Sequence, residues 1–286
     1  MTANSARMRG LAAELKQIRK DANITMREVS EQTGFSLAKL SRIENAIREI
    51  SLVDTASLAA VYRVTGDERA KLLDLAANVH QSSWWAFAGT HASAPAPLHW
   101  HLSALIAFEK QATRIVHAAM LRVPGLLQTP DYIRAVMMTG RVPVDRARVL
   151  IETRLRRQEI LRKANAPRYL AILDEGVLRR RMGSAELMAG QARHLCEMAE
   201  LPNVDIRVIT FDTGLHAGLE GSFSLMGFAA ASPVVFIEHG KSAVYLHEED
   251  EISAFQGEVS SMVKAALSSA DSVRFLRRLQ ASYSRE

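Results

Sequence analysis

The chain has 286 residues, of which 48% are hydrophobic and 23% charged, and its formal net charge is +5. This length predicts two domains of roughly 80 and 180 residues, each large enough to bury a core. No apolar run approaches the ~18 residues needed to cross a bilayer, and Met1 to Gly10 lacks the apolar stretch of a secretory signal. A single cysteine, Cys196, excludes an internal disulfide and a thiolate metal cluster. These features favour a cytoplasmic protein, and the modest positive charge permits a polyanionic partner without establishing one.

Residues 8–78 are predicted to form an all-α domain. Apolar residues recur there at helical spacing in five short blocks, and nothing alternates with the period of two that marks a strand. A linker is expected at 79–98, where Trp84-Trp85 precedes a Gly, Ala and Pro stretch from Gly89 to Pro97. The tryptophan pair is expected to anchor a core between domains rather than to form a ligand cage.

Residues 99–283 are predicted to form an α+β domain. Thr129-Pro130 indicates an N-cap followed by proline at the first position of a helix through Met138. The last three strand candidates are too close together for helical crossovers, so we expect a small, largely antiparallel sheet. Further helices are predicted at 102–120, 144–164, 185–200 and from about 250 to the end, and strands at 169–173, 204–210, 222–228, 234–238 and 243–246.

The most informative segment runs from Thr25 to Asn45. Thr25 and Glu28 form a capping-box pattern that begins a helix, and Gly34 ends it in a tight turn. Ser36 then caps a second helix. Two short helices joined by a glycine-containing turn are a helix-turn-helix unit, although a plain helical hairpin with a solvated basic face has the same spacing.

The second of these helices carries the candidate DNA-reading residues. Leu37, Leu40 and Ile43 are expected to share one face. The opposite side holds residues that can reach base edges or phosphates, with no acid before Glu44. These residues are Ala38, Lys39 and Arg42, with Ser36 and Ser41 beside them.

Residues 11–61 resemble the DNA-binding domain of the lambda-repressor/Cro-type (XRE) family. The resemblance rests on L-x-x-I-R from Leu15 to Arg19, on Thr33-Gly34, and on S-x-x-x-L-S-R-I-E-N from Ser36 to Asn45. It implies a structural ion pair between Arg19 and Glu44, and base-facing and phosphate-facing roles for Ser36, Ala38, Lys39 and Arg42. It also implies that a phosphate meets the helix start at Thr25 and Arg27, and that Asn45 and Arg48 rest on the DNA backbone. Leu37 departs from a position that is often polar in the family, so it either touches a thymine methyl or packs.

The remainder, from Trp84 to about Tyr283, resembles the C-terminal domain of WhiJ-like actinobacterial regulators. The resemblance rests mainly on VPGLLQTPDYIRA from Val123 to Ala135, LDEGVLRR from Leu173 to Arg180 and LPNVDIRVIT from Leu201 to Thr210. It implies a transcription regulator, often encoded beside a small partner protein in an arrangement likened to antitoxin and toxin.

No pattern in the second domain indicates catalysis, a metal or a cofactor, so we expect no enzyme. The loop from Gly214 to Gly221 precedes a strand rather than the helix that a phosphate loop requires. His216, His239 and His247 lack zinc-site spacing and are expected to be solvated at strand ends. Cys196 is expected to pack in a helix rather than to react.

Charge is the other conspicuous feature of the second domain. Between residues 146 and 181 there are eleven Arg and Lys residues against four acidic ones. Exposed helix faces account for this excess, and a surface for an acidic partner or for flanking DNA is the competing interpretation. Arg154, Arg157 and His216 are therefore candidate partner-binding residues.

The sequence thus predicts a dimeric transcriptional regulator, such as a repressor, that binds double-stranded DNA. Its second domain is expected to bind a protein partner or small effector. The alternative is an antitoxin-like protein that sequesters a small neighbouring protein and autoregulates its operon.

Overall fold

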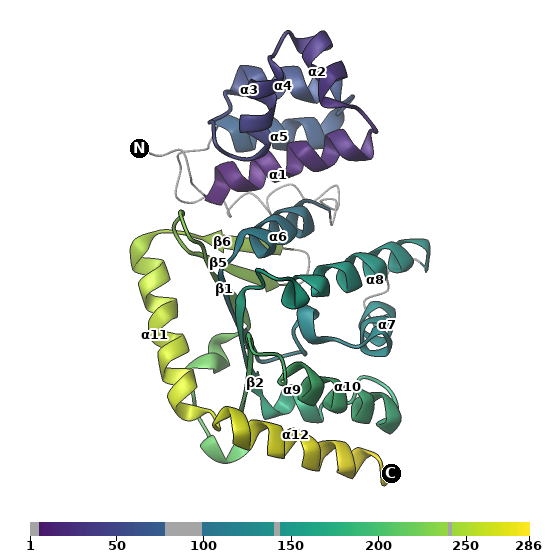
Figure 1. Ribbon diagram of the computed structural model, residues 1–286, viewed down its shortest axis with the longest axis vertical. Helices are drawn as coiled ribbons and strands as arrows, with labels where there is room; N and C mark the ends of the chain where they lie inside the picture. The colour runs from purple at the N-terminus through teal and green to yellow at the C-terminus, as the bar shows by residue number, and fades with distance from the viewer. Residues whose placement is uncertain (1–5, 78–98, 140–143, 240–241) are drawn as a thin grey trace. The chain divides into compact units, whose positions relative to one another are not determined.

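The computed structural model describes residues 6–77, 99–139, 144–239 and 242–286 (Figure 1). The expected linker at 79–98, including Trp84-Trp85, lies outside the described residues. Two compact units are formed, the first from residues 1–111 with 227–252 and the second from 112–226 with 253–286. No helix within the described ranges is both long and apolar enough to span a membrane.

The first unit begins with short helices that share one core. Leu15, Val29, Leu40 and Leu58 lie at its centre and are at most 1% exposed. Their helical spacing directs one face of each helix inward, and the prediction of a helical N-terminal region is confirmed. The helices of this core are α1 (Ala6–Asp21), α2 (Met26–Thr33), α3 (Leu37–Glu44), α4 (Leu52–Val61) and α5 (Gly66–Ala77). Helix α6 (His99–Gln111) belongs to the same unit. The unit also contains the antiparallel strands β5 (Val234–His239) and β6 (Ser242–Leu246).

Arg9 at the start of α1 is a buried cation within the first unit. Its guanidinium carbon lies 4.9 Å from the ring centre of Phe108 and 4.2 Å from that of Phe228, and its Nη2 donates to the Ser232 carbonyl at 3.2 Å. Burial lowers the pKa of Arg9 to about 10. Cation–π contact with two rings partly replaces the lost hydration and holds α1 to these residues.

The second unit is built on parallel strands covered by helices on both sides. Strands β1 (Arg114–Ala119), β2 (Arg168–Asp174) and β3 (Val204–Ile209) pair in parallel, with Arg114 opposite Arg168 and Tyr169 opposite Val204. In Figure 1, α7, α8 and α10 lie on one side of these strands and α11 on the other. The remaining elements are α7 (Pro130–Thr139), α8 (Val144–Gln158), α9 (Glu175–Arg179), α10 (Ala185–Met198), β4 (Phe223–Gly227), α11 (Glu249–Ala265), α12 (Ser269–Tyr283) and short 3-10 turns at Gly125–Leu127, Glu159–Arg162, Phe211–Thr213 and Ala217–Glu220.

The prediction of a small, largely antiparallel sheet is wrong. The strands form a mixed six-stranded sheet in the order β3-β2-β1-β4-β5-β6, in which β1, β2 and β3 are parallel. The error comes from the expected helix at 102–120, because α6 ends at Gln111 and Arg114–Ala119 is β1 instead. Ile115, Val116, Ala118 and Ala119 are all buried, so this strand shows no alternation of apolar and polar residues.

The other expected elements of the second domain lie close to their predicted positions. Strands occur at all five predicted sites, and α10 and α7 occupy the predicted helices at 185–200 and 130–138. The Thr129 hydroxyl accepts from the Tyr132 backbone N–H at 3.2 Å, as expected of an N-cap. The C-terminal helix is divided in two, because Ser268 caps α12 by accepting from Asp271 N at 3.1 Å.

Candidate nucleic-acid interface

The turn between α2 and α3 has the geometry that the sequence predicts. Gly34 has φ +71°, a left-handed conformation, and its N–H donates to the Ser30 carbonyl. The Ser36 hydroxyl then accepts from the Lys39 N–H at 3.1 Å and begins α3. The two helices of the motif are therefore set by local hydrogen bonds.

The start of α2 carries a complete capping box. The Thr25 hydroxyl accepts from Glu28 N at 3.2 Å, and Thr25 N donates to Glu28 Oε2 at 2.7 Å. Hydrogen bonds from the Thr25 backbone and then its side chain lower the pKa of Glu28. The Glu28 carboxylate thus lies beside the expected phosphate site at this helix start. The first-turn N–H groups of Met26 and Arg27 stay available to an anion.

The exposed surface of α3 includes an apolar residue in its first turn. Leu40 and Ile43 are 1% exposed and join the core, but Leu37 is 50% exposed. The sequence left open whether Leu37 touches a thymine methyl or packs, and the structure leaves half of its surface exposed in the first turn of α3. Ser36, Ala38, Ser41 and Arg42 are exposed beside it.

Lys39 is held away from the other predicted DNA-reading residues. Its ammonium lies 2.8 Å from Asp54 Oδ1 on α4 and 3.5 Å from the ring centre of Phe35. The Lys39 and Asp54 side chains are only 21% and 19% exposed. Lys39 therefore joins α3 to α4, a role that the sequence analysis missed because it depends on a residue 15 positions away.

Three arginines flank the exposed surface of α3 without an internal partner. Within the described part of the chain, Arg27, Arg42 and Arg48 are exposed and form no ion pair or side-chain hydrogen bond. Asn45 is more constrained, because its amide donates to the Ser41 carbonyl at 2.8 Å and accepts from Lys16 Nζ at 3.1 Å. Among the described residues, Arg27, Arg42 and Arg48 are thus exposed cations without an ion-pair partner, in and around a helix with a mixed polar and apolar surface.

The implied ion pair between Arg19 and Glu44 is present. Arg19 Nε and Nη2 lie 2.6 and 2.9 Å from the two carboxylate oxygens, and Arg19 Nη1 donates to the Ile24 carbonyl at 2.9 Å. The hydrogen bond that Arg19 donates to Glu44 raises the pKa of Arg19. This pair fastens α1 to α3 and makes no part of the exposed surface.

The partner-binding candidates on α8 are half-buried. Arg154 Nη1 donates to Gln128 Oε1 at 2.9 Å, and a side chain at Gly125 would meet Arg154 and Arg157 at 3.8 to 4.0 Å. Gln158 Nε2 donates to the Gly125 and Gln128 carbonyls at 3.0 and 2.8 Å. These side chains hold the PGLLQ segment in place, which gives Arg154 and Arg157 structural contacts. Their role in partner binding stays a prediction.

His216 is buried, so the expectation of a solvated histidine is wrong for this residue. Its side chain is 2% exposed, with Nε2 3.3 Å from Asp174 Oδ2, and Nδ1 accepts from Gly218 N at 3.2 Å. The contact with Gly218 places the imidazole proton on Nε2, toward Asp174. His216 thus fastens its loop to the carboxyl end of β2, and its role in partner binding stays a prediction.

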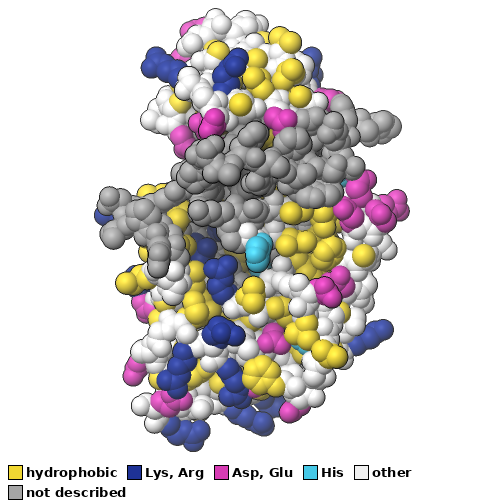
Figure 2. Space-filling view, turned by 180° about the vertical axis from the view of Figure 1, so that it is seen from behind, with side chains coloured by type: hydrophobic (Ala, Val, Ile, Leu, Met, Phe, Trp, Pro, Cys, Tyr) yellow, Lys and Arg dark blue, Asp and Glu magenta, His cyan; other side chains and the backbone are white. Residues whose placement is uncertain are grey.

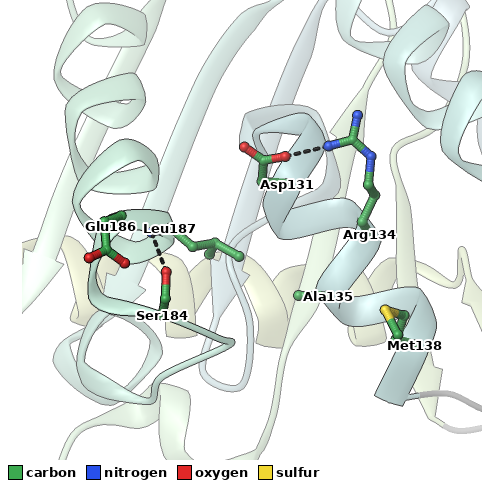
Figure 3. A pocket seen from close by; sticks show the side chains of 7 residues that line it. All are labelled: Asp131, Arg134, Ala135, Met138, Ser184, Glu186 and Leu187. Atoms are coloured by element: carbon green, nitrogen blue, oxygen red, sulfur yellow. Dashed lines mark hydrogen bonds and ion pairs between the residues drawn. The ribbon is translucent and has the colours of Figure 1, made fainter.

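The histidines of the second domain form no metal site within the described residues. Within residues 6–77, 99–139, 144–239 and 242–286, no group of three His, Cys, Asp or Glu side chains could hold a metal. Cys196 is buried, as expected. An open hollow of about 450 Å³ lies between α7 and the start of α10. Figure 3 shows that Asp131 pairs with Arg134 there and that Ser184 bonds to the Leu187 backbone, so these polar groups already have partners.

Two family models match the chain. A family model described as a helix-turn-helix domain matches residues 11–72, which confirms the predicted motif. A model described as a domain of unknown function (DUF5753) matches residues 102–278, more than half of the chain. No curated protein and no solved structure matches the chain. The resemblances to the XRE family and to WhiJ-like regulators stay predictions.

Proposed function

Because the chain belongs to the family defined by the domain of unknown function DUF5753 and carries a helix-turn-helix domain before it, we propose that it is a sequence-specific transcription regulator of XRE type. The observation that carries this proposal is the exposed surface of α3, where Arg42 lies free beside Ala38 and Ser41. Arg27 and Arg48, which have no ion-pair partner among the described residues, precede and follow α3 in the chain at positions that suit backbone phosphates. Such a protein acts in the cytoplasm, where the DNA is, and does no chemistry.

The DNA-binding form is a homodimer on a pseudo-palindromic site. A single short helix reads too few base pairs for specificity, so two copies bind half-sites about one helical turn apart. This symmetry predicts that the best site selected from random duplexes is palindromic. Whether the regulator represses or activates depends on where such sites lie relative to promoters.

The test compares three arginine-to-alanine variants on the selected site and on an unrelated duplex. Arg42→Ala weakens specific binding by roughly 1 to 3 kcal/mol and leaves non-specific binding nearly unchanged, because it reads a base. Arg27→Ala and Arg48→Ala weaken binding to every duplex, because the two arginines contact phosphates. Each variant reduces the slope of log K against log salt by about one. If Arg42→Ala binds its best site as tightly as wild type, α3 is not the recognition helix.

We further propose that the second domain binds an acidic protein partner, and a cluster of exposed cations favours this role. Arg114 and Arg168 lie opposite each other at the amino ends of β1 and β2, with Arg162 and Lys163 just before β2. No acidic side chain pairs with any of these four in the described part of the chain. Like charges opposite each other on neighbouring strands are unfavourable, so an acidic surface would be held strongly there. Figure 2 shows Lys and Arg side chains on the second unit.

This cationic cluster is better exposed than the sequence-predicted Arg154, Arg157 and His216. Arg114→Glu with Arg168→Glu should weaken a complex with a small acidic protein encoded by an adjacent gene, measured by calorimetry at two salt concentrations. Arg193→Glu with Arg278→Glu, elsewhere on the unit, is the control for net charge. A complex unaffected by the first pair would place the partner elsewhere. If the partner instead blocks DNA binding, the antitoxin-like alternative gains support.

A further inference from the structure

The first turn of the recognition helix exposes an apolar surface at the point where a helix-turn-helix protein meets base edges. Leu37 is 50% exposed and Ala38 beside it is also exposed. The N-terminal residues of a recognition helix lie deepest in the major groove. An exposed leucine there is unusual, because the groove floor consists largely of polar donors and acceptors.

The one cation in this first turn is directed elsewhere. Lys39 is bound to Asp54 at 2.8 Å and lies over the Phe35 ring. Arg42, one turn later, is therefore the free cation of α3. The helix thus divides into an apolar first turn and a cationic second turn.

We propose that Leu37, with Ala38, reads thymine methyl groups, and that each half-site carries a thymine next to the guanine read by Arg42. This inference rests on the proposed DNA-binding function and names the base chemistry of its site. Thymine alone presents a methyl group in the major groove, whereas guanine presents two acceptors that suit an arginine. A leucine placed over guanine or cytosine would remove polar groups from water without replacing their hydrogen bonds.

The test removes the methyl group and nothing else. The best site is first selected from random duplexes with the full chain, and each thymine is then replaced singly by deoxyuridine, which keeps the same base pair. At one or more positions per half-site the wild type should bind about fourfold more weakly, the effect of one buried methyl. Leu37→Ala should bind the thymine site more weakly by a similar factor and lose its sensitivity to deoxyuridine.

A matched leucine outside the motif provides the control. Leu121 is 63% exposed in the second unit, and Leu121→Ala should keep the full sensitivity to deoxyuridine. Equal binding of thymine and deoxyuridine sites by the wild type would overturn the inference, as would full sensitivity in Leu37→Ala. Failure to select any site would instead overturn the proposed function, so the two failures are distinguishable.

Discussion

Arg19 on α1 and Glu44 on α3 form a two-pronged ion pair, with nitrogen to oxygen distances of 2.6 and 2.9 Å. The side chains are only 11% and 3% exposed. Removing Glu44 leaves the Arg19 guanidinium buried without its counter-charge. Glu44→Ala should therefore lower the free energy of unfolding by about 3 kcal/mol or more.

The matched control is Glu31→Ala, which removes an exposed carboxylate from α2. An exposed charge contributes roughly 0 to 1 kcal/mol, so this variant should melt close to wild type. Thermal and urea unfolding of the two variants provide the measurement. Equal stability of the two variants would mean that the pair does not fasten α1 to α3.

The contact between Lys39 and Asp54 predicts a gain of DNA affinity. Asp54→Asn removes the counter-charge and releases the Lys39 ammonium to reach a phosphate. Binding to all duplexes should tighten, and the slope of log K against log salt should steepen by about 0.9. Lys39→Met alone should leave the slope unchanged, and adding it to Asp54→Asn should cancel the gain. A smaller slope in Lys39→Met than in wild type would show that Lys39 already contacts DNA in the wild-type protein.

Glu28 predicts a second gain of affinity at the start of α2. Its carboxylate bonds to Thr25, beside the N–H groups where a phosphate would bind. Glu28→Gln keeps the capping-box geometry and removes the repulsion, so DNA affinity should rise by roughly two- to fivefold at low salt. Fluorescence anisotropy measures this change against Glu31→Gln, which lies at the far end of the same helix. Affinity that rises equally in both variants would indicate a general charge effect and no phosphate at this helix start.

His117 makes the second unit sensitive to acid. Its Nδ1 lies 3.0 Å from Ser224 Oγ, and burial, followed by the charge of Arg157, lowers the pKa of His117 to about 4. Between pH 4 and pH 6.5, the ordinary pKa of histidine, His117 is protonated in the unfolded chain and neutral in the folded chain. Stability should therefore be complete above pH 6.5 and fall as the pH approaches 4, by at most about 3 kcal/mol.

The measurement is urea unfolding at several pH values in this window. His117→Gln cannot titrate, so the loss of stability between pH 6.5 and 4 should be smaller in this variant than in wild type. Any carboxylates that titrate in the same range affect both proteins and cancel in the difference. Identical pH profiles would show that the pKa of His117 is the same in the folded and the unfolded chain.

The sequence alone determined the helix-turn-helix motif, because its signals are local. Thr25 bonds to Glu28 three residues away, Gly34 adopts its own left-handed conformation, and Ser36 caps the helix that follows it. Such contacts depend on neighbours within one turn and are readable from spacing. Exposure of Arg27 and Arg42 followed from the same helical periodicity.

Only the tertiary structure decided which residues the motif leaves free and how the sheet is arranged. Lys39 and Arg42 look equivalent in sequence, but Asp54 on another helix binds one of them and leaves the other exposed. Arg114–Ala119 is a strand because it pairs with β2, more than fifty residues later, and is covered on both faces. A strand buried on both faces has no period of two, so its apolar run reads equally well as a helix until its partner is in place.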